Sequence, residues 1–318
     1  MNKKLAISVA VIAVLLLIVI ISNVKRSRDV PELPEIKAGS DEILINREAG
    51  VIRLFKKDGK WVAGDKAYPA DANKAGEIEK RFKEMRLTDL ISSKGYYSRY
   101  DLTPDKYVEV ILKKGDTILR RFKVGKKSPT NRHTFVKIDD RPEIYLAEGT
   151  FDMVLNKELD DFRDREVLKV GRDAVSALTV EYQGMNFAFT RTREAKTDTG
   201  AGKKNDEKKQ KGQAWGSWTC RGYETVKLND SMVDGLVQAL DPLRAASFLD
   251  MPKEALTQRV CSVQVKAGER EMILTVYRYN EKYAAATSEY PYVFEVEKYA
   301  IERFFITGID RFRAAVKQ

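Results

Sequence analysis

Histidine and cysteine are scarce in this chain, which has one histidine, His133, and two cysteines, Cys220 and Cys261, among 318 residues. A metal site built on several histidines is therefore excluded, and at most one histidine-based catalytic triad is possible. The nucleophile motif Gly-x-Ser-x-Gly is also missing. We therefore expect a protein that is not an enzyme and that binds no metal ion and no cofactor.

Outside two short stretches, positive and negative charges are nearly balanced. The chain has 57 Lys and Arg against 47 Asp and Glu, a net charge of +10. Residues 1–28 contain five bases and no acid, and residues 191–211 contain eight bases and four acids. A nucleic-acid-binding protein needs its positive charge gathered on a folded face. Nucleic acid is therefore not expected as a partner.

The long apolar run of this chain covers residues 5–21, where Ser8 is the single polar side chain. Its 17 residues are at the short end of the roughly 17 to 25 that a membrane-spanning helix needs, and Lys4 and Lys25 can snorkel to the interfaces. A cleaved signal peptide would have a shorter apolar region and an Ala-x-Ala-like site, and neither is found. We expect a single-pass anchor at residues 1–28 in the cell inner membrane. Its short tail is expected in the cytoplasm and the body of the protein in the periplasm or outside the cell.

Residues 29–40 follow the anchor and contain Pro31 and Pro34. Proline restricts the backbone to extended conformations of about 3.1 Å per residue. These residues are therefore expected to form a stiff stalk between the anchor and the folded body.

The remaining chain follows one plan twice, in residues 41–170 and residues 171–318. Each copy opens with short alternating strands and turns, and the tryptophans Trp61 and Trp218 hold matching places in them. A helix with one apolar stripe comes next, and then a strand hairpin and a second pair of strands. The expected fold class is α+β, with two tandem, duplicated domains in which helices pack on antiparallel meander sheets.

The expected helices have clear start signals and apolar faces. In the first copy, Asp71 or Asn73 is the expected N-cap, and in the second copy it is Asn229 or Asp230. The apolar residues that follow recur every three or four positions; they are Ala75, Ile78, Phe82 and Met85, and Val233, Leu236, Val237 and Leu240. Residues 192–214 interrupt the second copy with a Lys- and Gly-rich insertion that has few apolar side chains, so we expect this insertion to be disordered.

Tyrosines are concentrated near the C-terminus, where Tyr277, Tyr279, Tyr290 and Tyr292 fall on expected strands. Tyrosine combines a large apolar area with a polar tip, so these side chains suit either cross-strand packing or a platform that binds a protein edge or a glycan. Tyr97 lies in a smaller cluster beside Arg99 and leaves the same two alternatives. All six residues are candidates for partner binding.

Both cysteines, Cys220 and Cys261, fall on expected strands of the second copy. Thiols outside the cytoplasm can oxidise to a disulfide if their Cα atoms come within about 7 Å. A disulfide between them is therefore possible if the two strands are neighbours, and two buried free thiols are the alternative.

Four short motifs in the first copy resemble those of the bacterial DUF4340 domain family, whose function is uncharacterised. They are Gly59, Lys60 and Trp61 in a strand; Tyr68, Pro69, Ala70 and Asp71 before a helix; the Arg-Tyr-Asp-Leu-Thr-Pro segment at residues 99–104; and Phe162, Arg163, Asp164 and Arg165 at the close. The resemblance covers most of residues 41–170 and is weaker in the second copy. It supplies no catalytic residues.

The resemblance implies a role in the cell envelope. Proteins of this kind are commonly membrane-anchored and often occur with an ABC transporter of the gliding-motility type. We therefore expect an extracytoplasmic accessory protein whose partner is the permease or an auxiliary subunit of such a transporter. The alternative is a module that binds envelope glycan or another ligand through its tyrosine-rich hairpins.

Overall fold

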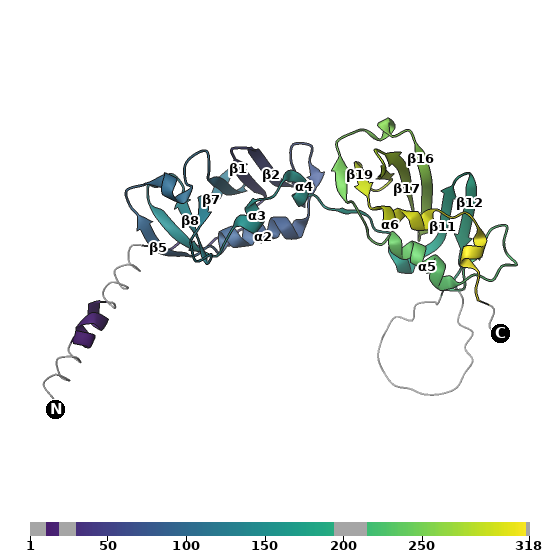
Figure 1. The fold of residues 1–318 in the computed structure, drawn as a ribbon, viewed down its shortest axis with the longest axis horizontal. Helices are drawn as coiled ribbons and strands as arrows, with labels where there is room; N and C mark the ends of the chain where they lie inside the picture. The colour runs from purple at the N-terminus through teal and green to yellow at the C-terminus, as the bar shows by residue number, and fades with distance from the viewer. Residues whose placement is uncertain (1–10, 19–29, 194–214, 316–318) are drawn as a thin grey trace, which may run out of the picture. The chain divides into compact units, whose positions relative to one another are not determined.

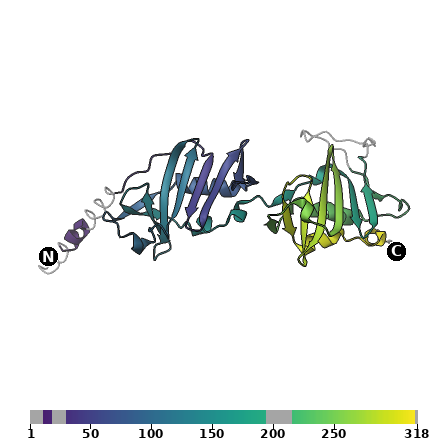
Figure 2. The same cartoon turned by 90° about the horizontal axis from the view of Figure 1, so that it is seen from above.

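The computed structural model describes residues 11–18, 30–193 and 215–315, and the chain divides into two compact units, Met1–Asp164 and Arg165–Gln318. Each unit contains its own antiparallel sheet with helices packed on it (Figures 1 and 2). The division falls before residue 165 because Val167, Leu168 and Val170 are buried in the hydrophobic core of the second unit. The prediction of an α+β fold built from antiparallel sheets and helices is confirmed.

The first sheet has nine strands in the order β4, β3, β2, β1, β6, β7, β8, β9, β5, all paired antiparallel. Their bounds are β1 Glu42–Arg47, β2 Gly50–Lys57, β3 Lys60–Ala63, β4 Tyr68–Pro69, β5 Leu87–Ser92, β6 Val108–Lys114, β7 Thr117–Lys127, β8 His133–Ile138 and β9 Ile144–Glu148. Side chains alternate between the two faces of a strand. In β1, for example, Ile43 and Ile45 are fully buried on the face that the helix covers.

Helix α2, Ala72–Lys83, covers one face of the first sheet (Figure 1). Asp71 is its N-cap, as expected, and its carboxylate accepts a hydrogen bond from the Asn73 N–H group at 2.9 Å. The buried side chains Ala75, Ile78 and Phe82 face the sheet, where the ring of Phe82 lies 6.2 Å from that of Phe122. Two short helices, α3 Asp152–Leu155 and α4 Leu159–Phe162, complete this layer.

The opposite face of the first sheet is partly covered by the loop after β5, which contains the 3₁₀ turn η1, Tyr97–Tyr100. Leu102 of this loop is buried against Phe135 and Ile144 of the sheet. The loop lies so close to β7 that a Cβ atom on Gly125 would be 2.2 Å from the Tyr100 carbonyl oxygen. Glycine at this position is therefore required by the close approach of two backbone segments.

The second sheet has eight strands in the order β13, β12, β11, β16, β17, β18, β19, β15. Their bounds are β11 Val175–Tyr182, β12 Met185–Thr190, β13 Thr219–Cys220, β15 Ser247–Leu249, β16 Arg259–Ala267, β17 Arg270–Tyr279, β18 Lys282–Thr287 and β19 Val293–Val296. This order matches that of the first sheet from β3 to β5, and β4 has no counterpart. A separate two-stranded sheet pairs β10, Glu166–Leu168, with β14, Leu243–Arg244.

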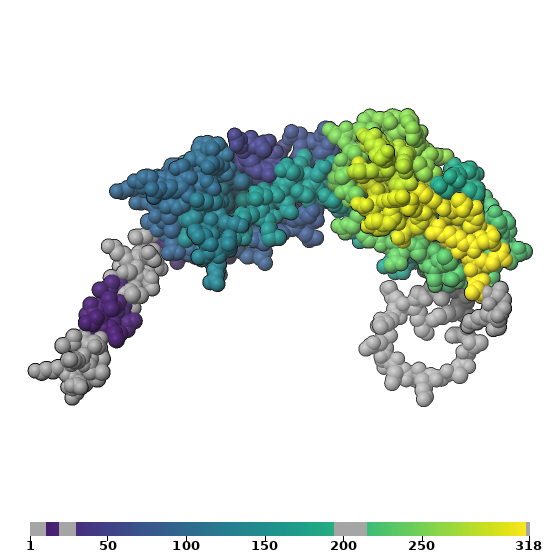
Figure 3. Space-filling view, in the orientation of Figure 1, coloured from purple at the N-terminus to yellow at the C-terminus, as the bar shows by residue number. Residues whose placement is uncertain are grey.

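Helix α5, Asp230–Ala239, packs on the second sheet through Val233, Leu236 and Val237, and its N-cap is Asn229, as expected. The remaining short helical elements are η2 Arg172–Ala174, η3 Lys253–Ala255, α6 Lys298–Ile301, η4 Glu302–Phe304 and η5 Ile309–Phe312. Buried side chains of the C-terminal elements, including Phe304 and Phe312, belong to the core of this unit. Figure 3 shows the C-terminal segment, in yellow, on the visible face of the second unit.

Two expected features fall partly outside the described residues. Of the apolar run at residues 5–21, only residues 11–18 are described, and they are helical. Within the described ranges, no helix is long and apolar enough to cross a membrane. Of the expected insertion at residues 192–214, residues 194–214 lie outside the described part, and Arg193 and Trp215 on its two sides form an antiparallel bridge.

Candidate functional site

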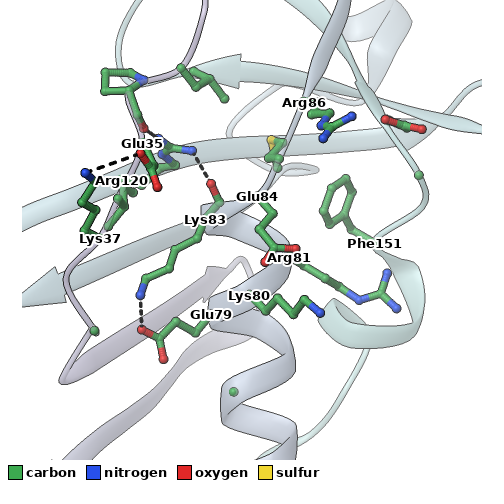
Figure 4. A pocket seen from close by; sticks show the side chains of 18 of the residues that line it. Glu35, Lys37, Glu79, Lys80, Arg81, Lys83, Glu84, Arg86, Arg120 and Phe151 are labelled. Carbon is green, nitrogen blue, oxygen red and sulfur yellow. Dashed lines mark hydrogen bonds and ion pairs between the residues drawn. The ribbon is translucent and has the colours of Figure 1, made fainter.

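A pocket of about 1040 Å³ lies at the C-terminal end of α2 in the first unit (Figure 4). It is lined by Arg120 of β7 and by three segments: residues 33–39 before β1, α2 from Gly76 onward with Met85 and Arg86, and residues 148–151 at the end of β9. We call residues 31–40 the strap. The pocket therefore lies where the chain enters the first unit, between the strap and the start of the edge strand β5.

Arg120, on the interior strand β7, fixes the strap to the unit. Its side chain is 8% exposed, and its guanidinium donates hydrogen bonds to the carbonyl oxygen of Lys83 at 2.9 Å and to that of Pro34. The first bond also satisfies a carbonyl group at the end of α2 that has no partner within the helix. Burial lowers the pKa of Arg120, an effect that the nearby charge of Asp139 opposes.

The other end of the strap is held by Glu79 of α2. Its Oε1 atom accepts a hydrogen bond from the Ser40 N–H group at 2.6 Å and forms an ion pair with Lys83 at 2.8 Å. Burial alone would raise the pKa of Glu79, but the hydrogen bonds from Lys83 and Ser40 hold this pKa below its ordinary value. The stalk expected at residues 29–40 is thus docked on the first unit through Leu33, Pro34 and Ser40.

The charges around the pocket are mixed, with an excess of bases. Its lining contains six basic side chains and four acidic ones; they are Lys37, Lys80, Arg81, Lys83, Arg86 and Arg120, and Glu35, Glu79, Glu84 and Glu148. Several of them are paired, as Lys37 is with Glu35 and Arg81 is with Glu77. Lys80 and Arg86 have no ion pair among the residues that the structure describes. The pocket therefore offers free cationic groups beside the apolar side chains of Leu33, Met85 and Phe151.

The described residues contain no group of three or more His, Cys, Asp and Glu side chains that could hold a metal ion. His133 begins β8, after a turn that contains Ser128. The hydroxyl of Ser128 lies 3.0 Å from that of Thr130, with which it shares a hydrogen bond.

The groups brought together in the pocket suit binding through charge, apolar contact and backbone pairing.

The candidate tyrosines of the second unit lie in two different places: Tyr277 and Tyr279 are on β17, as expected, whereas Tyr290 and Tyr292 are in the turn between β18 and β19 and not on a strand. Tyr290 is 5% exposed and packs against Phe248 and Phe294, and Tyr292 meets the Tyr290 ring edge-on at 5.7 Å. Tyr277 and Tyr279 pack on the opposite face, in a cluster of apolar residues built on Leu256, Ala284 and Val293. The structure therefore does not bring the four side chains together into one exposed platform. The burial of Tyr290 and the half-buried state of the other three favour the packing interpretation.

Tyr97 and Arg99 lie together in η1 on the first unit. The hydroxyl of Tyr97 donates a hydrogen bond to the Pro142 carbonyl oxygen at 3.2 Å, and the Lys137 ammonium lies 4.0 Å from the centre of its ring. Arg99 is exposed, and its guanidinium lies 5.6 Å from the ring of Tyr96, which is 62% exposed. Tyr97 thus fastens the loop to the sheet, while Tyr96 and Arg99 form its outer surface.

Cys220 and Cys261 are both free and buried, so the possible disulfide is not formed. They lie on β13 and β16, and two further strands, β12 and β11, separate these in the sheet. Neighbouring strands are about 4.8 Å apart, so the spacing far exceeds the roughly 7 Å that a disulfide allows. The prediction depended on the strands being neighbours, and the order of strands is not visible in the alternation of residues.

The pocket itself was missed by sequence reasoning. Its signals in the sequence are the two prolines of the strap and the three bases in the last turn of α2, Lys80, Arg81 and Lys83. Bases are common at the ends of helices because they interact favourably with the helix dipole, so they did not single out a site. The docking of the strap depends on Arg120, which is distant in sequence.

A family model described as "Domain of unknown function (DUF4340)" matches residues 61–259. The matched segment is more than half of the chain and extends from β3 of the first sheet into β16 of the second. It includes α2, Tyr97 and Arg99, whereas the strap and the hairpin of β17 and β18 lie outside it. No curated protein and no solved structure matches the chain.

Proposed function

Because the chain belongs to the DUF4340 family, a family of unknown function, we propose that it is a membrane-anchored, non-enzymatic interaction protein of the cell envelope. In this proposal its partner is the permease or an auxiliary subunit of an ABC transporter. The observation that carries the proposal is the strap, which joins the apolar run at residues 5–21 to the first unit and is held there by Arg120 and Glu79. An anchor followed directly by a docked segment holds the first unit near the membrane.

The proposal also includes the sidedness and the origin of the two units. The apolar run serves as a single transmembrane helix, with its short tail in the cytoplasm and the body in the periplasm or outside the cell. Support comes from its length and from Lys4 and Lys25 at its ends. The two units derive from a duplication, which the shared strand order of the two sheets supports.

Crosslinking in intact cells tests the proposed partner. A photoreactive amino acid is placed in the full-length chain at Tyr96 in one variant and at Tyr299 in another, since these side chains are 62% and 73% exposed. A third variant carries it at the buried residue Phe122 and serves as the control. After mild-detergent purification and mass spectrometry, we expect to recover a transporter permease or auxiliary subunit with at least one of the two exposed positions. The control variant should recover neither protein. Recovery of no envelope protein from either exposed position would contradict the proposal.

A fusion to alkaline phosphatase at the C-terminus tests the sidedness separately. This enzyme is active only outside the cytoplasm, so the proposal predicts an active fusion in intact cells. An inactive fusion that is present in full amount would place the body on the cytoplasmic side.

Binding of an envelope glycan is the alternative function, and it has less support. A glycan platform needs exposed aromatic rings, but Tyr290 is buried and Tyr277, Tyr279 and Tyr292 pack against core clusters. The same purification distinguishes the two functions, because cell-wall fragments without transporter subunits would favour the glycan.

A further inference from the structure

In the second unit, the position between helix α5 and the edge strand β15 is filled by a short pair of strands. β10 pairs with β14, and its residues Val167 and Leu168 are each 2% exposed. Arg244 on β14 forms an ion pair with Glu166 on β10, with 3.7 Å between Nη1 and Oε2. An acidic residue followed by two aliphatic residues therefore fills this place in extended form.

In the first unit, helix α2 and the edge strand β5 follow each other in the same way, but no strand fills the position between them, and the pocket lies there. Met85 and Arg86 lie between α2 and β5, just as Leu243 and Arg244 lie between α5 and β15. Met85 and Leu243 point inward and are 6% and 1% exposed, whereas both arginines are exposed. The strap precedes β1 as β10 precedes β11, yet it forms no strand with Met85 and Arg86, and the pocket lies between them (Figure 4).

The prolines of the strap explain why the place is open. A strand that pairs at this position must donate backbone N–H groups, and proline has none. Leu33, the apolar residue between Pro31 and Pro34, packs on the core of the first unit. The strap is thus attached through Leu33 and through the Pro34 carbonyl group, and its backbone leaves the neighbouring strand position unfilled.

Charge identifies what fits the open position. Arg244 has a carboxylate partner supplied by the filling strand, whereas Arg86 has no ion pair within the described ranges. The floor of the pocket is apolar, because Met85 and Phe151 are buried and line it. A segment with a carboxylate for Arg86 and aliphatic side chains for this floor matches both features.

We infer that the pocket is an unfilled strand position that binds an extended segment of a partner protein, in which an acidic residue is followed by aliphatic residues. The Arg86 carbonyl group already accepts a hydrogen bond from the Glu148 N–H group at 2.9 Å, so the segment pairs along the backbone at Met85. Its carboxylate forms an ion pair with the Arg86 side chain, as in other cases of strand addition to a sheet edge. This inference rests on the proposed function, since it names the chemistry of the partner that an interaction protein would recognise.

Fluorescence anisotropy with a labelled peptide tests the inference. The probe is a peptide with blocked ends that copies residues 165–170 of this chain, Arg-Glu-Val-Leu-Lys-Val, and the target is the full-length chain in detergent. We expect saturable binding that Arg86→Glu weakens about tenfold, because an attraction becomes a repulsion. A peptide with Lys in place of Glu166 should show the opposite preference and bind the Arg86→Glu protein more tightly than the unchanged protein.

Two further variants test whether the peptide binds in the pocket and not elsewhere on the protein. Arg141→Glu reverses an exposed arginine in the turn between β8 and β9, outside the pocket, and should bind the peptide as the unchanged protein does. Pro31→Glu combined with Pro34→Lys gives the strap backbone donors, so that it can fill the position itself and weaken peptide binding. Absence of saturable binding, or equal binding by the Arg86→Glu protein, overturns the inference.

The outcome of this test is separable from that of the proposed function. Failure of the peptide to bind, with a transporter subunit still recovered by crosslinking, removes the strand position and leaves the function. Peptide binding without any envelope partner removes the function and leaves the strand position.

Discussion

Gly125 occupies a position where a single methyl group is too large. A Cβ atom would lie 2.2 Å from the Tyr100 carbonyl oxygen and 3.0 Å from Leu102 Cγ, so η1 and its loop would have to move away from β7. We expect Gly125→Ala to lower the free energy of unfolding by about 1 to 3 kcal/mol, the usual cost of overpacking. Urea denaturation followed by circular dichroism measures this.

The control for this prediction is Gly308→Ala, where an added Cβ meets no atom within 4 Å and the backbone is extended. It should change the free energy of unfolding by less than about 0.5 kcal/mol. Unchanged stability in the Gly125→Ala protein would show that the loop does not lie against β7.

The two thiols should be unreactive in the folded protein. Burial raises the pKa of Cys220, and it raises the pKa of Cys261 to about 12, so neither forms the reactive thiolate at pH 8. We expect no reaction with a thiol reagent such as DTNB until denaturant is added, when two thiols react. Reaction of fewer than two thiols in denaturant without a reductant would indicate the disulfide that the strand order excludes.

The raised pKa of Cys261 also sets a dependence of stability on pH. An unfolded cysteine ionises near its ordinary value of 9, whereas the folded one ionises near 12. The unfolded state therefore loses its proton first, and the contribution of Cys261 to the free energy of unfolding is constant below pH 9 and falls as the pH rises toward 12. Cys261→Val should remove this contribution, which comparison of urea denaturation at pH 8 and pH 10.5 measures. An identical decrease in both proteins would show that Cys261 is not its source.

At the scale of elements, both main helices contain an interior glycine that their packing does not require. An added Cβ at Gly76 of α2 or Gly235 of α5 meets no atom within 4 Å. Alanine is favoured over glycine in a helix interior by about 1 kcal/mol. We expect Gly76→Ala and Gly235→Ala each to raise the free energy of unfolding by roughly 0.5 to 1 kcal/mol. A loss of stability in urea denaturation would mean that the helix packs more tightly than the described contacts show.

The helices and strands of this fold could be predicted from local patterns, but the order in which the strands lie side by side in each sheet could not. Alternation in strands such as β1 and the capping residues Asp71 and Asn229 are properties of adjacent residues, so the sequence reveals them directly. Strand order is not local. For this reason the sequence left open both a disulfide between Cys220 and Cys261 and two buried free thiols, and the strand order decides for the free thiols.

The candidate site was predicted less well than the fold, because its contacts join distant residues. Arg120 reaches the carbonyl group of Pro34, which is 86 positions away in the sequence. The tyrosine cluster is conspicuous in the sequence, yet Tyr290 is a core residue and Tyr277 packs on the other face of the sheet. Composition shows where aromatic residues are frequent, and only the tertiary structure shows which of them remain exposed.

At the scale of the whole molecule, each unit has a separate hydrophobic core. The core of the first unit is built around Phe82 and Phe122, and that of the second around Phe189 and Phe294. We expect residues 165–318, expressed alone, to fold and to unfold in urea in one cooperative transition, because the elements that bury this core all lie within the fragment. A broad, non-cooperative loss of circular dichroism signal would show that the second unit needs the first.

The bond between Arg120 and the strap has a mechanical consequence. β7, which carries Arg120, lies between β6 and β8 inside the first sheet, so the strap is attached to an interior strand. Tension that arrives along the chain from its N-terminal side is therefore transferred through Arg120 to the centre of the sheet before it reaches β1. The backbone hydrogen bonds that join β7 to β6 and β8 would then share this load with those of β1.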